Sequence, residues 1–319
     1  MKELGWLPDT SVDAILAAVA SVAPDLQPGT VRVRTARESR GSSPSRGTAT
    51  LDDRYMVKFA CSERAAAAIY REGLIFELLG QDEFSVPVPN VVAIGRHPAL
   101  VITEMVAGEP LAFDDPLLST PDGQAAVGRV LGRTLSALHD DAVREAVIGA
   151  SLNSVRPQPQ AGTPELRNRF LPLVSSDLRA LVLTWCEWTD EALASEPPPD
   201  CFVHGDLHGF NQVWDLGGPT LHGLVDLEES GLADPHYDFR YLPAQAPGVV
   251  LLECAVASYT EVGSRTLSID RIMAWHVRTC LGDALWRTEA GVALPDGGTV
   301  DGWVDDLARR FTSLSLRPG

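Results

Sequence analysis

Lysine is nearly absent from this sequence. Among 26 basic residues only Lys2 and Lys58 are lysines, and all the others are arginines. Lys58 lies inside the apolar segment 55–60, which is predicted to be a β-strand. A charge inside a strand is rare unless a partner neutralises it. A compact ammonium suits a phosphate oxygen, although an edge-strand lysine that reaches to solvent explains Lys58 alone equally well.

Cysteine motifs and long apolar runs are also missing. The five cysteines are scattered and have no C-x-x-C spacing, which argues against a disulfide framework and against a cysteine zinc site. No stretch of 18 apolar residues occurs, and the first residues have no signal-peptide pattern. We therefore expect a cytoplasmic protein without a membrane partner. At 45% hydrophobic residues, a chain of 319 can bury a core of one large domain or two lobes.

The charge balance is strongly acidic. The net charge of −17 argues against a nucleic-acid partner. Residues 30–71 are an exception, since they carry more basic than acidic side chains. A positive segment around Lys58 suits a polyphosphate, and an acidic remainder suits a cationic acceptor, although ordinary solubilising surface charge explains most of these carboxylates as well. The sequence leaves the choice between monomer and dimer open.

The chemistry is concentrated in one motif of the second half. An apolar strand-like segment runs into His204, Gly205 and Asp206, and Asn211 follows; a second short apolar segment then leads to Asp226. Phosphoryl transfer needs a carboxylate that accepts the proton of the attacking hydroxyl, and hard oxygen ligands for Mg²⁺. An Asp, an Asn and a second Asp in this order supply those oxygens. The imidazole of His204 is predicted to bind nearby backbone groups and so to fix the loop.

This pattern resembles the aminoglycoside/macrolide phosphotransferases, the antibiotic kinases that share the protein-kinase fold. Their signature His-x-Asp-x-x-x-x-Asn is present as His204, Asp206 and Asn211, and their downstream metal-binding aspartate as Asp226. The resemblance implies Asp206 as the catalytic base and Asn211 and Asp226 as Mg²⁺ ligands. It implies ATP or GTP as co-substrate and an α+β, bilobal protein-kinase-like fold, with a small antiparallel-sheet lobe and a larger, mainly helical lobe.

The segment before Lys58 matches the layout of a phosphate-covering loop. Predicted strands at 31–34 and 48–51 flank a loop of small residues, and a turn then leads to the strand of Lys58. The loop lacks G-x-G-x-x-G, so its phosphate-contacting amides are not fixed by a motif. The candidates are Ser42, Ser43 and Ser45.

A strong helix is predicted over 62–79, with Ser62 as its N-cap and Gly80 at its end. The family pattern places the acid that pairs with the strand lysine at Glu72, although a solvent-facing helix acid is the simpler interpretation. Predicted strands around 86–92 and 100–106 follow.

The hinge is expected directly after this small lobe, so that residues 1–105 form the nucleotide-binding lobe and 106–319 the catalytic and substrate-binding lobe. In kinase-like folds the hinge backbone binds adenine. The resemblance therefore implies main-chain contacts from Glu104, Met105 and Val106.

The rest of the chain is predicted to be helical. Asp234 is expected to cap a helix, and Asp238 to brace the catalytic loop. The predicted helices span 122–139, about 165–194, about 248–262, 270–290 and 301–313.

The acceptor is the least determined part. Glu228 and Glu229 follow the metal-binding segment and could pair with amino groups of an aminocyclitol. Trp275 and Trp286 could instead stack on a macrolide or a peptide antibiotic, although core packing is the commoner role of tryptophan. An antibiotic kinase is the leading hypothesis. A metabolic kinase of choline, homoserine or sugar type shares these motifs, and a catalytically silent nucleotide-binding module is the alternative outside the enzymes.

Overall fold

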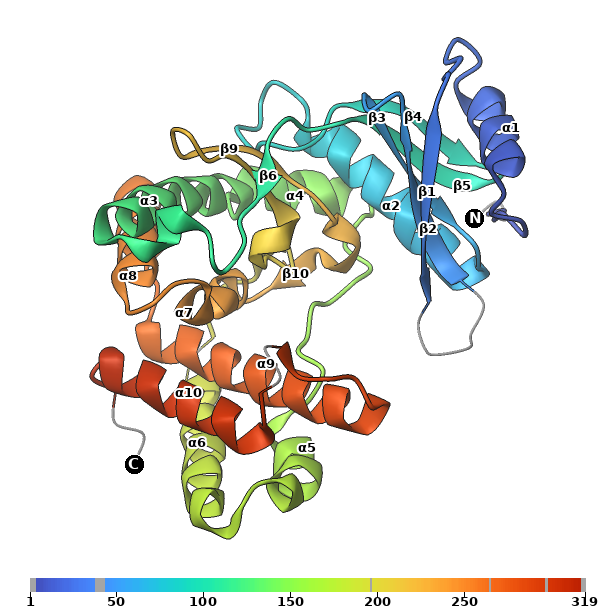
Figure 1. Ribbon diagram of the computed structural model, residues 1–319. Helices are drawn as coiled ribbons and strands as arrows, with labels where there is room; N and C mark the ends of the chain where they lie inside the picture. The colour runs from blue at the N-terminus through green and yellow to red at the C-terminus, as the bar shows by residue number, and fades with distance from the viewer. Residues whose placement is uncertain (1–3, 38–43, 196, 264, 296–297, 317–319) are drawn as a thin grey trace.

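The computed structural model describes residues 4–37, 44–195, 197–263, 265–295 and 298–316, and it has the bilobal α+β architecture that the sequence predicts (Figure 1). The small lobe is built on one antiparallel sheet with the strand order β1-β2-β3-β5-β4. Its strands are β1 Val31–Arg37, β2 Pro44–Leu51, β3 Tyr55–Ala60, β4 Val91–Arg96 and β5 Ala99–Glu104.

One helix covers each face of this sheet. Helix α1 (Val12–Val22) packs with Val57 and Phe59, and α2 (Glu63–Leu79) packs with Ala60 and Val101. Since side chains alternate between the two faces of a strand, Lys58 lies on the same face as Ala60, towards α2. The strand register places Lys58 between Thr48 of β2 and Val101 of β5. The lysine is therefore in a central strand and not at an edge.

The larger lobe is mainly helical, and none of the described helices is long and apolar enough to cross a membrane. Its helices are α3 Pro121–Leu138, α4 Asp141–Gly149, α5 Thr163–Glu165, α6 Ser176–Ala194, α7 Leu242–Gln245, α8 Val250–Val262, α9 Ile269–Ala290 and α10 Val300–Ser313. Short helical turns are η1 Pro116–Ser119, η2 Leu166–Phe170, η3 Leu171–Leu173, η4 Gly209–Asn211, η5 Leu227–Glu229 and η6 Pro235–Tyr241.

Two small sheets carry the motif segments. Strands β6 (Glu109–Pro110), β8 (Gln212–Asp215) and β9 (Thr220–Leu224) form one, and β7 (Cys201–Val203) pairs with β10 (Gly231–Ala233) in the other. The catalytic-loop motif starts where β7 ends, and Asp226 follows β9. The sheets therefore bring the two motif segments together.

The predicted helices near 248–262, 270–290 and 301–313 are confirmed, but the single helix expected over 165–194 is wrong. The chain forms α5, η2 and η3 first, and α6 begins only at Ser176. Pro172 lacks a backbone N–H and cannot continue a regular helix, so the chain breaks there. The sequence analysis also missed α4, which Asp140 caps by accepting a hydrogen bond from the N–H of Ala142 at 2.8 Å.

Helices α3 and α8 cross at very short range because α3 has no side chain at the contact. A Cβ atom on Gly132 would lie 2.2 Å from the carbonyl oxygen of Ala255, and one on Gly128 would lie 2.5 Å from that of Leu251. Small residues thus let the two backbones touch in the core beneath the catalytic loop. Figure 1 shows both helices on the side of the large lobe away from α5.

We expect Gly132→Ala to lower the free energy of unfolding by about 1–3 kcal/mol, because an added methyl group must push two packed helices apart. Gly149→Ala is the matched control, since Gly149 ends α4 and a Cβ there meets nothing within 4 Å. This control should be neutral or stabilising by up to about 1 kcal/mol. Urea unfolding measures both variants. Equal stabilities of Gly132→Ala and the wild type would contradict the packing argument.

Candidate active site

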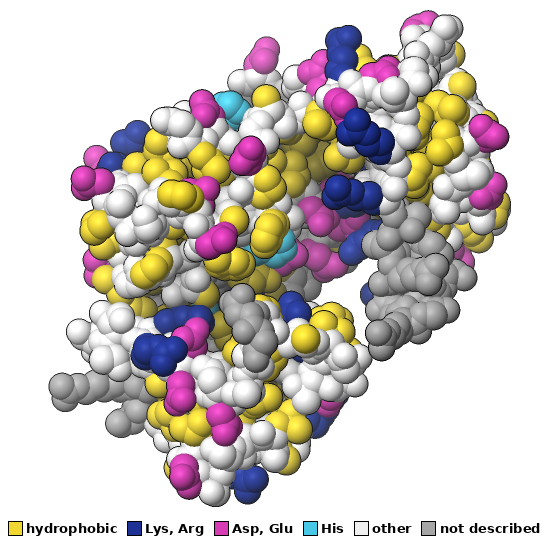
Figure 2. All heavy atoms as spheres, in the orientation of Figure 1, with side chains coloured by type: hydrophobic (Ala, Val, Ile, Leu, Met, Phe, Trp, Pro, Cys, Tyr) yellow, Lys and Arg dark blue, Asp and Glu magenta, His cyan; other side chains and the backbone are white. Residues whose placement is uncertain are grey.

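Lys58 is the centre of the site. Its Nζ lies 2.8 Å from Glu72 Oε2 and 2.7 Å from Asp226 Oδ1, and it also forms an ion pair with Glu228. Only 15% of the lysine side chain is exposed. In this structure the lysine therefore does not reach to solvent, and Glu72 is not a solvent-facing helix acid. Figure 2 shows acidic and basic side chains gathered in the hollow between the two lobes.

Helix α2 ties this lysine to the large lobe. Glu72 uses its second oxygen, Oε1, to accept a hydrogen bond from the N–H of Leu227 at 2.8 Å. The neighbouring Arg71 donates to the carbonyl of Ser230 at 2.6 Å and to that of Leu152 at 2.8 Å. Adjacent residues of one helix thus hold both the lysine and the segment that carries Asp226.

The electrostatics of the cluster follow from burial and crowding. Burial raises the pKa of Glu72 to about 7, against the opposing effect of Lys58, and the carboxylates of Asp226 and Glu228 add to the rise. Burial lowers the pKa of Lys58, but the three carboxylates outweigh this effect and hold it above its ordinary value. For Asp226, burial acts upward, yet the nearby ammonium keeps the pKa below its usual range. The lysine therefore stays charged, and negative charge is in excess.

The residues present fit a hard cation. Glu72, Asp226 and Glu228 each offer a carboxylate oxygen, and these oxygens lie within 4.8 Å of one another. Asp226 has φ 63° and ψ 59°, a left-handed conformation that sets its side chain at the bend before η5. Asn211 donates from Nδ2 to the carbonyl of Asp206 at 2.8 Å, which leaves its Oδ1 available as a ligand. Such an all-oxygen donor set suits Mg²⁺.

A buried carboxylate shapes the catalytic loop. Asp238 accepts hydrogen bonds from the N–H groups of His204 at 2.7 Å and Gly205 at 2.9 Å, and its Oδ2 lies 3.0 Å from His139 Nε2. Burial acts to raise the pKa of Asp238, but the hydrogen bond from His139 and the nearby groups outweigh it, so the pKa is lowered. Asp238 thus braces the loop before Asp206.

His204 connects the two motif segments. Its Nδ1 accepts from the N–H of Asp206 at 3.3 Å, so its Nε2 carries the proton and donates to the carbonyl of Val225 at 3.0 Å. Burial lowers the pKa of His204, in keeping with a neutral ring. The imidazole fixes backbone on both sides, as the sequence analysis expects, and positions Asp206 relative to Asp226.

Asp206 lies at the cleft with its side chain one-third exposed. Its Oδ1 accepts a hydrogen bond from the hydroxyl of Tyr241 at 2.7 Å, and its Oδ2 lies 3.5 Å from His208 Nε2. The sequence analysis missed Tyr241. The sequence indicated it only by its position three residues after Asp238. That this segment approaches the catalytic loop depends on the tertiary structure and cannot be read from the sequence.

Two backbone N–H groups of the segment expected to be the hinge are already bonded within the protein. The N–H of Glu104 donates to the carbonyl of Asn90 at 2.9 Å, and that of Met105 donates to the carbonyl of Arg54 at 2.8 Å. Among the described residues, the N–H of Val106 has no such partner. Met105 is 43% exposed, and its side chain is available as a surface for a planar base.

The phosphate-loop candidates are only partly described. Ser42 and Ser43 lie outside the described residues, whereas Ser45 is on β2, and its carbonyl accepts from the N–H of Cys61 at 2.8 Å. The neighbouring Arg46, which the sequence analysis did not single out, forms an ion pair with Glu228. This arginine adds a second cation beside Lys58.

The two glutamates expected at an acceptor lie differently. Glu228 is buried against Lys58 and Arg46, so it is part of the Lys58 cluster. Glu229 is exposed. The indole N–H of Trp275 donates to Asp234 Oδ2 at 3.0 Å, a structural contact, whereas Trp286 on α9 is 44% exposed.

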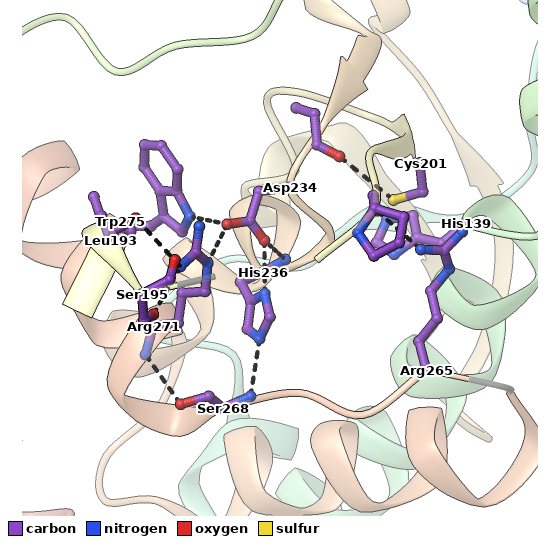
Figure 3. A network of polar contacts seen from close by, with 12 residues as sticks. His139, Leu193, Ser195, Cys201, Asp234, His236, Arg265, Ser268, Arg271 and Trp275 are labelled. Carbon is purple, nitrogen blue, oxygen red and sulfur yellow. Dashed lines mark hydrogen bonds and ion pairs between the residues drawn. The ribbon is translucent and has the colours of Figure 1, made fainter. Parts of the chain in front are cut away.

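Asp234 links η6 to α9 and, through Arg271, to the end of α6 (Figure 3). It caps η6 by accepting from the N–H of His236 at 3.0 Å, as the sequence predicts, and it pairs with Arg271 of α9. Arg271 in turn donates to the carbonyl of Ala192 at the end of α6 at 3.1 Å. Burial raises the pKa of Asp234, but its hydrogen bonds from His236 and Arg271 bring it down to about 2. This junction anchors η6, which carries Asp238 and Tyr241.

Lys58 comes from a strand and Glu72 from a helix, and Asp226 is a carboxylate that can bind a metal. Together with the loop of Asp206, these residues have the arrangement of a kinase-type phosphotransferase. Comparisons with known proteins agree. The model of the phosphotransferase enzyme family matches residues 39–255, and viomycin phosphotransferase of Streptomyces vinaceus is 30% identical over 197 residues, covering 59% of this chain and 67% of that protein. The chain therefore belongs to the phosphotransferase enzyme family, which confirms the resemblance.

Solved structures share its fold. An aminoglycoside 2'-phosphotransferase-IIIa in complex with GDP has a TM-score of 0.68 at 18% identity, over 95% of this chain and 99% of that chain. A macrolide 2'-phosphotransferase from Brachybacterium faecium has a TM-score of 0.59 at 19% identity, over 97% and 99%. The kinase-like fold is thus confirmed.

We expect Asp238→Asn to lower the free energy of unfolding by about 3 kcal/mol, because the amide places a donor against backbone N–H groups in a buried site. Asp215→Asn is the matched control, since Asp215 is exposed and binds only the N–H of Gly217 in the described structure. Denaturant unfolding at neutral pH measures both.

The pH dependence of this difference gives a second check. The folded-state pKa of Asp238 is depressed below 3.8, so its contribution is complete above the unfolded value and is lost as the pH falls through the folded one. The gap between the wild type and Asp238→Asn should therefore shrink only in strong acid. A gap that closes at neutral pH would contradict this role.

Proposed function

We propose that the protein transfers the γ-phosphate of ATP or GTP to a hydroxyl group of an antibiotic in the cytoplasm. The observation that carries this proposal is the convergence of Lys58, Glu72 and Asp226, together with the link from His204 to the backbone of both Asp206 and Val225. The antibiotic relatives support the acceptor class. A metabolic kinase of choline, homoserine or sugar type remains the alternative, because it would use the same machinery.

In this proposal the residues divide the work as the phosphoryl transfer requires. The acceptor oxygen forms a bond to the γ-phosphorus while the bond to the β–γ bridging oxygen breaks, and the acceptor proton passes to the carboxylate of Asp206. Lys58, oriented by Glu72, binds phosphate oxygens as a fixed positive charge. Asn211 and Asp226 would hold Mg²⁺, which neutralises the charge on the transferred and leaving oxygens.

The nucleotide base is proposed to bind at the hinge. The N–H of Val106 is the donor that the described contacts leave for a base nitrogen, and the side chain of Met105 offers an apolar surface. The carbonyl of Glu104 is a candidate acceptor for an exocyclic amine. Ser45, next to Arg46, is the described candidate for covering the phosphates.

The acceptor is proposed to bind against aromatic rings beside Asp206. Phe113 and Phe210 are 51% and 56% exposed and meet edge to face with centroids 6.3 Å apart. His208 links Phe210 to Tyr241 through further edge contacts at 6.1 and 5.8 Å. Exposed aromatic pairs at a catalytic loop favour an acceptor with an apolar or ring-shaped face. With Glu228 engaged by Lys58, Glu229 is left as the nearby acid for an amino group.

We expect Asp206→Asn to reduce phosphoryl transfer by about a hundredfold or more, because the proton of the acceptor loses its base, while the Kd of the nucleotide stays unchanged. The assay follows release of nucleoside diphosphate with viomycin, kanamycin, a macrolide, choline and homoserine as acceptors. Asp215→Asn serves as control and should keep full activity. Turnover confined to choline or homoserine would replace the antibiotic by the metabolic alternative, and an active Asp206→Asn would refute the assignment of the base.

For the acceptor surface, we expect Phe210→Ala and Phe113→Ala each to raise the KM of the acceptor about fivefold, since each removes a ring contact of about 1 kcal/mol. The KM of the nucleotide should not change. Trp286→Ala tests the other aromatic surface, and we expect normal kinetics from it. A higher acceptor KM in Trp286→Ala alone would move the acceptor to α9.

A further inference from the structure

The hydrogen bond from Tyr241 to the proposed base has a rigid support behind it. The side chain of Arg240 is 3% exposed, and its guanidinium lies between two aromatic rings, 3.7 Å from the centroid of Tyr237 and 4.2 Å from that of Tyr241. Its Nη2 donates to the carbonyl of Gly205 at 2.7 Å and to the hydroxyl of Tyr241 at 3.1 Å. The tyrosine hydroxyl therefore accepts from Arg240 and must direct its own proton to Asp206.

Two helices of the large lobe fix this arginine from the other side. The carbonyl of Arg240 accepts from His276 Nδ1 at 2.6 Å, and His276 Nε2 lies 2.9 Å from Nη1 of Arg310 on α10. Burial lowers the pKa of His276 to about 3, and the charge of Arg310 adds to this effect, so the ring is neutral and accepts from the arginine. A continuous chain of polar contacts thus runs from α10 through His276 and Arg240 to Tyr241 and Asp206.

The geometry also contains a competing arrangement. Nη2 of Arg240 lies 3.6 Å from Oδ1 of Asp206, just beyond hydrogen-bond distance. A carboxylate that turned fully onto the guanidinium would form a charge-assisted bond and would point away from an acceptor hydroxyl. The hydroxyl of Tyr241 is placed between them, since it contacts both groups.

We propose that Tyr241 is the positioning residue of the base: it holds Oδ1 of Asp206 and so leaves Oδ2, which lies 3.5 Å from His208 Nε2, for the acceptor hydroxyl. This inference rests on the proposed role of Asp206. Burial raises the pKa of Tyr241 above its ordinary value, so the phenol keeps the proton that it donates. Tyr241 itself takes no proton from the acceptor and contacts no phosphate in this arrangement.

The test compares two tyrosines that stack on the same guanidinium. Tyr241→Phe keeps the ring on Arg240 and removes the hydrogen bond to Asp206. Tyr237→Phe is the matched control, because its ring also stacks on Arg240 and its hydroxyl makes no hydrogen bond with a described residue. We expect kcat of Tyr241→Phe to fall about ten- to a hundredfold, the range for losing a hydrogen bond to a charged group, with unchanged KM values for nucleotide and acceptor. Tyr237→Phe should keep the kcat of the wild type.

Two further results decide between positioning and folding. The Tm of both variants should stay within a few degrees of the wild type, and adding Tyr241→Phe to Asp206→Asn should cause no additional loss of kcat. An unchanged kcat in Tyr241→Phe, or equal losses in Tyr241→Phe and Tyr237→Phe, would overturn the inference while leaving Asp206 as the base. Full turnover of Asp206→Asn would instead refute the proposed function itself.

Discussion

The structure depends on one buried ammonium. Lys58 of the small lobe contacts Glu72 from its own lobe and Asp226 and Glu228 from the large lobe. Removing a charge from water is costly, so the ammonium is stable only while these partners stay in place. The same helix that supplies Glu72 also supplies Arg71, which binds the carbonyl of Ser230. The ion pairs of Lys58 therefore help to fix the position of one lobe relative to the other.

A second buried charge has the same function on the other side of the cleft. Asp238 accepts hydrogen bonds from the backbone N–H groups of His204 and Gly205. The side chain of His204 in turn donates to the carbonyl of Val225. The contacts of Asp238 and His204 reach as far as Val225. Asp226, the next residue along the chain, contacts Lys58, so the two sets of contacts are adjacent. The positions of the proposed base and of the proposed metal ligands are thus fixed by hydrogen bonds and ion pairs within the protein.

The sequence predicted the parts that depend on local pattern. The strand of Lys58, the helix of Glu72 and the brace Asp238 each follow from a motif or from helical spacing, and the structure has them in place. The break near Pro172 was readable from the missing N–H of proline, but the predicted helix followed the Leu- and Trp-rich composition of the segment. The contacts between distant segments were not readable: Tyr241 reaches Asp206 only because η6 folds back against the catalytic loop.

Glu228 illustrates why position along the chain does not determine role. It lies two residues after Asp226, and the sequence made it a candidate partner for amino groups of an acceptor. Asp226 adopts a left-handed conformation, with φ 63°, and η5 begins directly afterwards. This bend turns the side chain of Glu228 back towards Lys58 and Arg46. The left-handed backbone of Asp226, which no sequence motif announces, thus accompanies the contacts of Glu228 with Lys58 and Arg46.

The charges around Lys58 also bear on the divalent cation proposed for this site. Glu72, Asp226 and Glu228 form their described ion pairs with Lys58 and Arg46, so these pairs join three carboxylates to two cations. Burial raises the pKa of Glu72 to about 7, and the neighbouring carboxylates of Asp226 and Glu228 add to this rise. A nucleoside triphosphate is itself a polyanion, and two basic side chains already engaged by carboxylates cannot offset it. Binding of the polyphosphate therefore calls for additional positive charge, and the oxygens of Asn211 and Asp226 suit a hard divalent ion that supplies it.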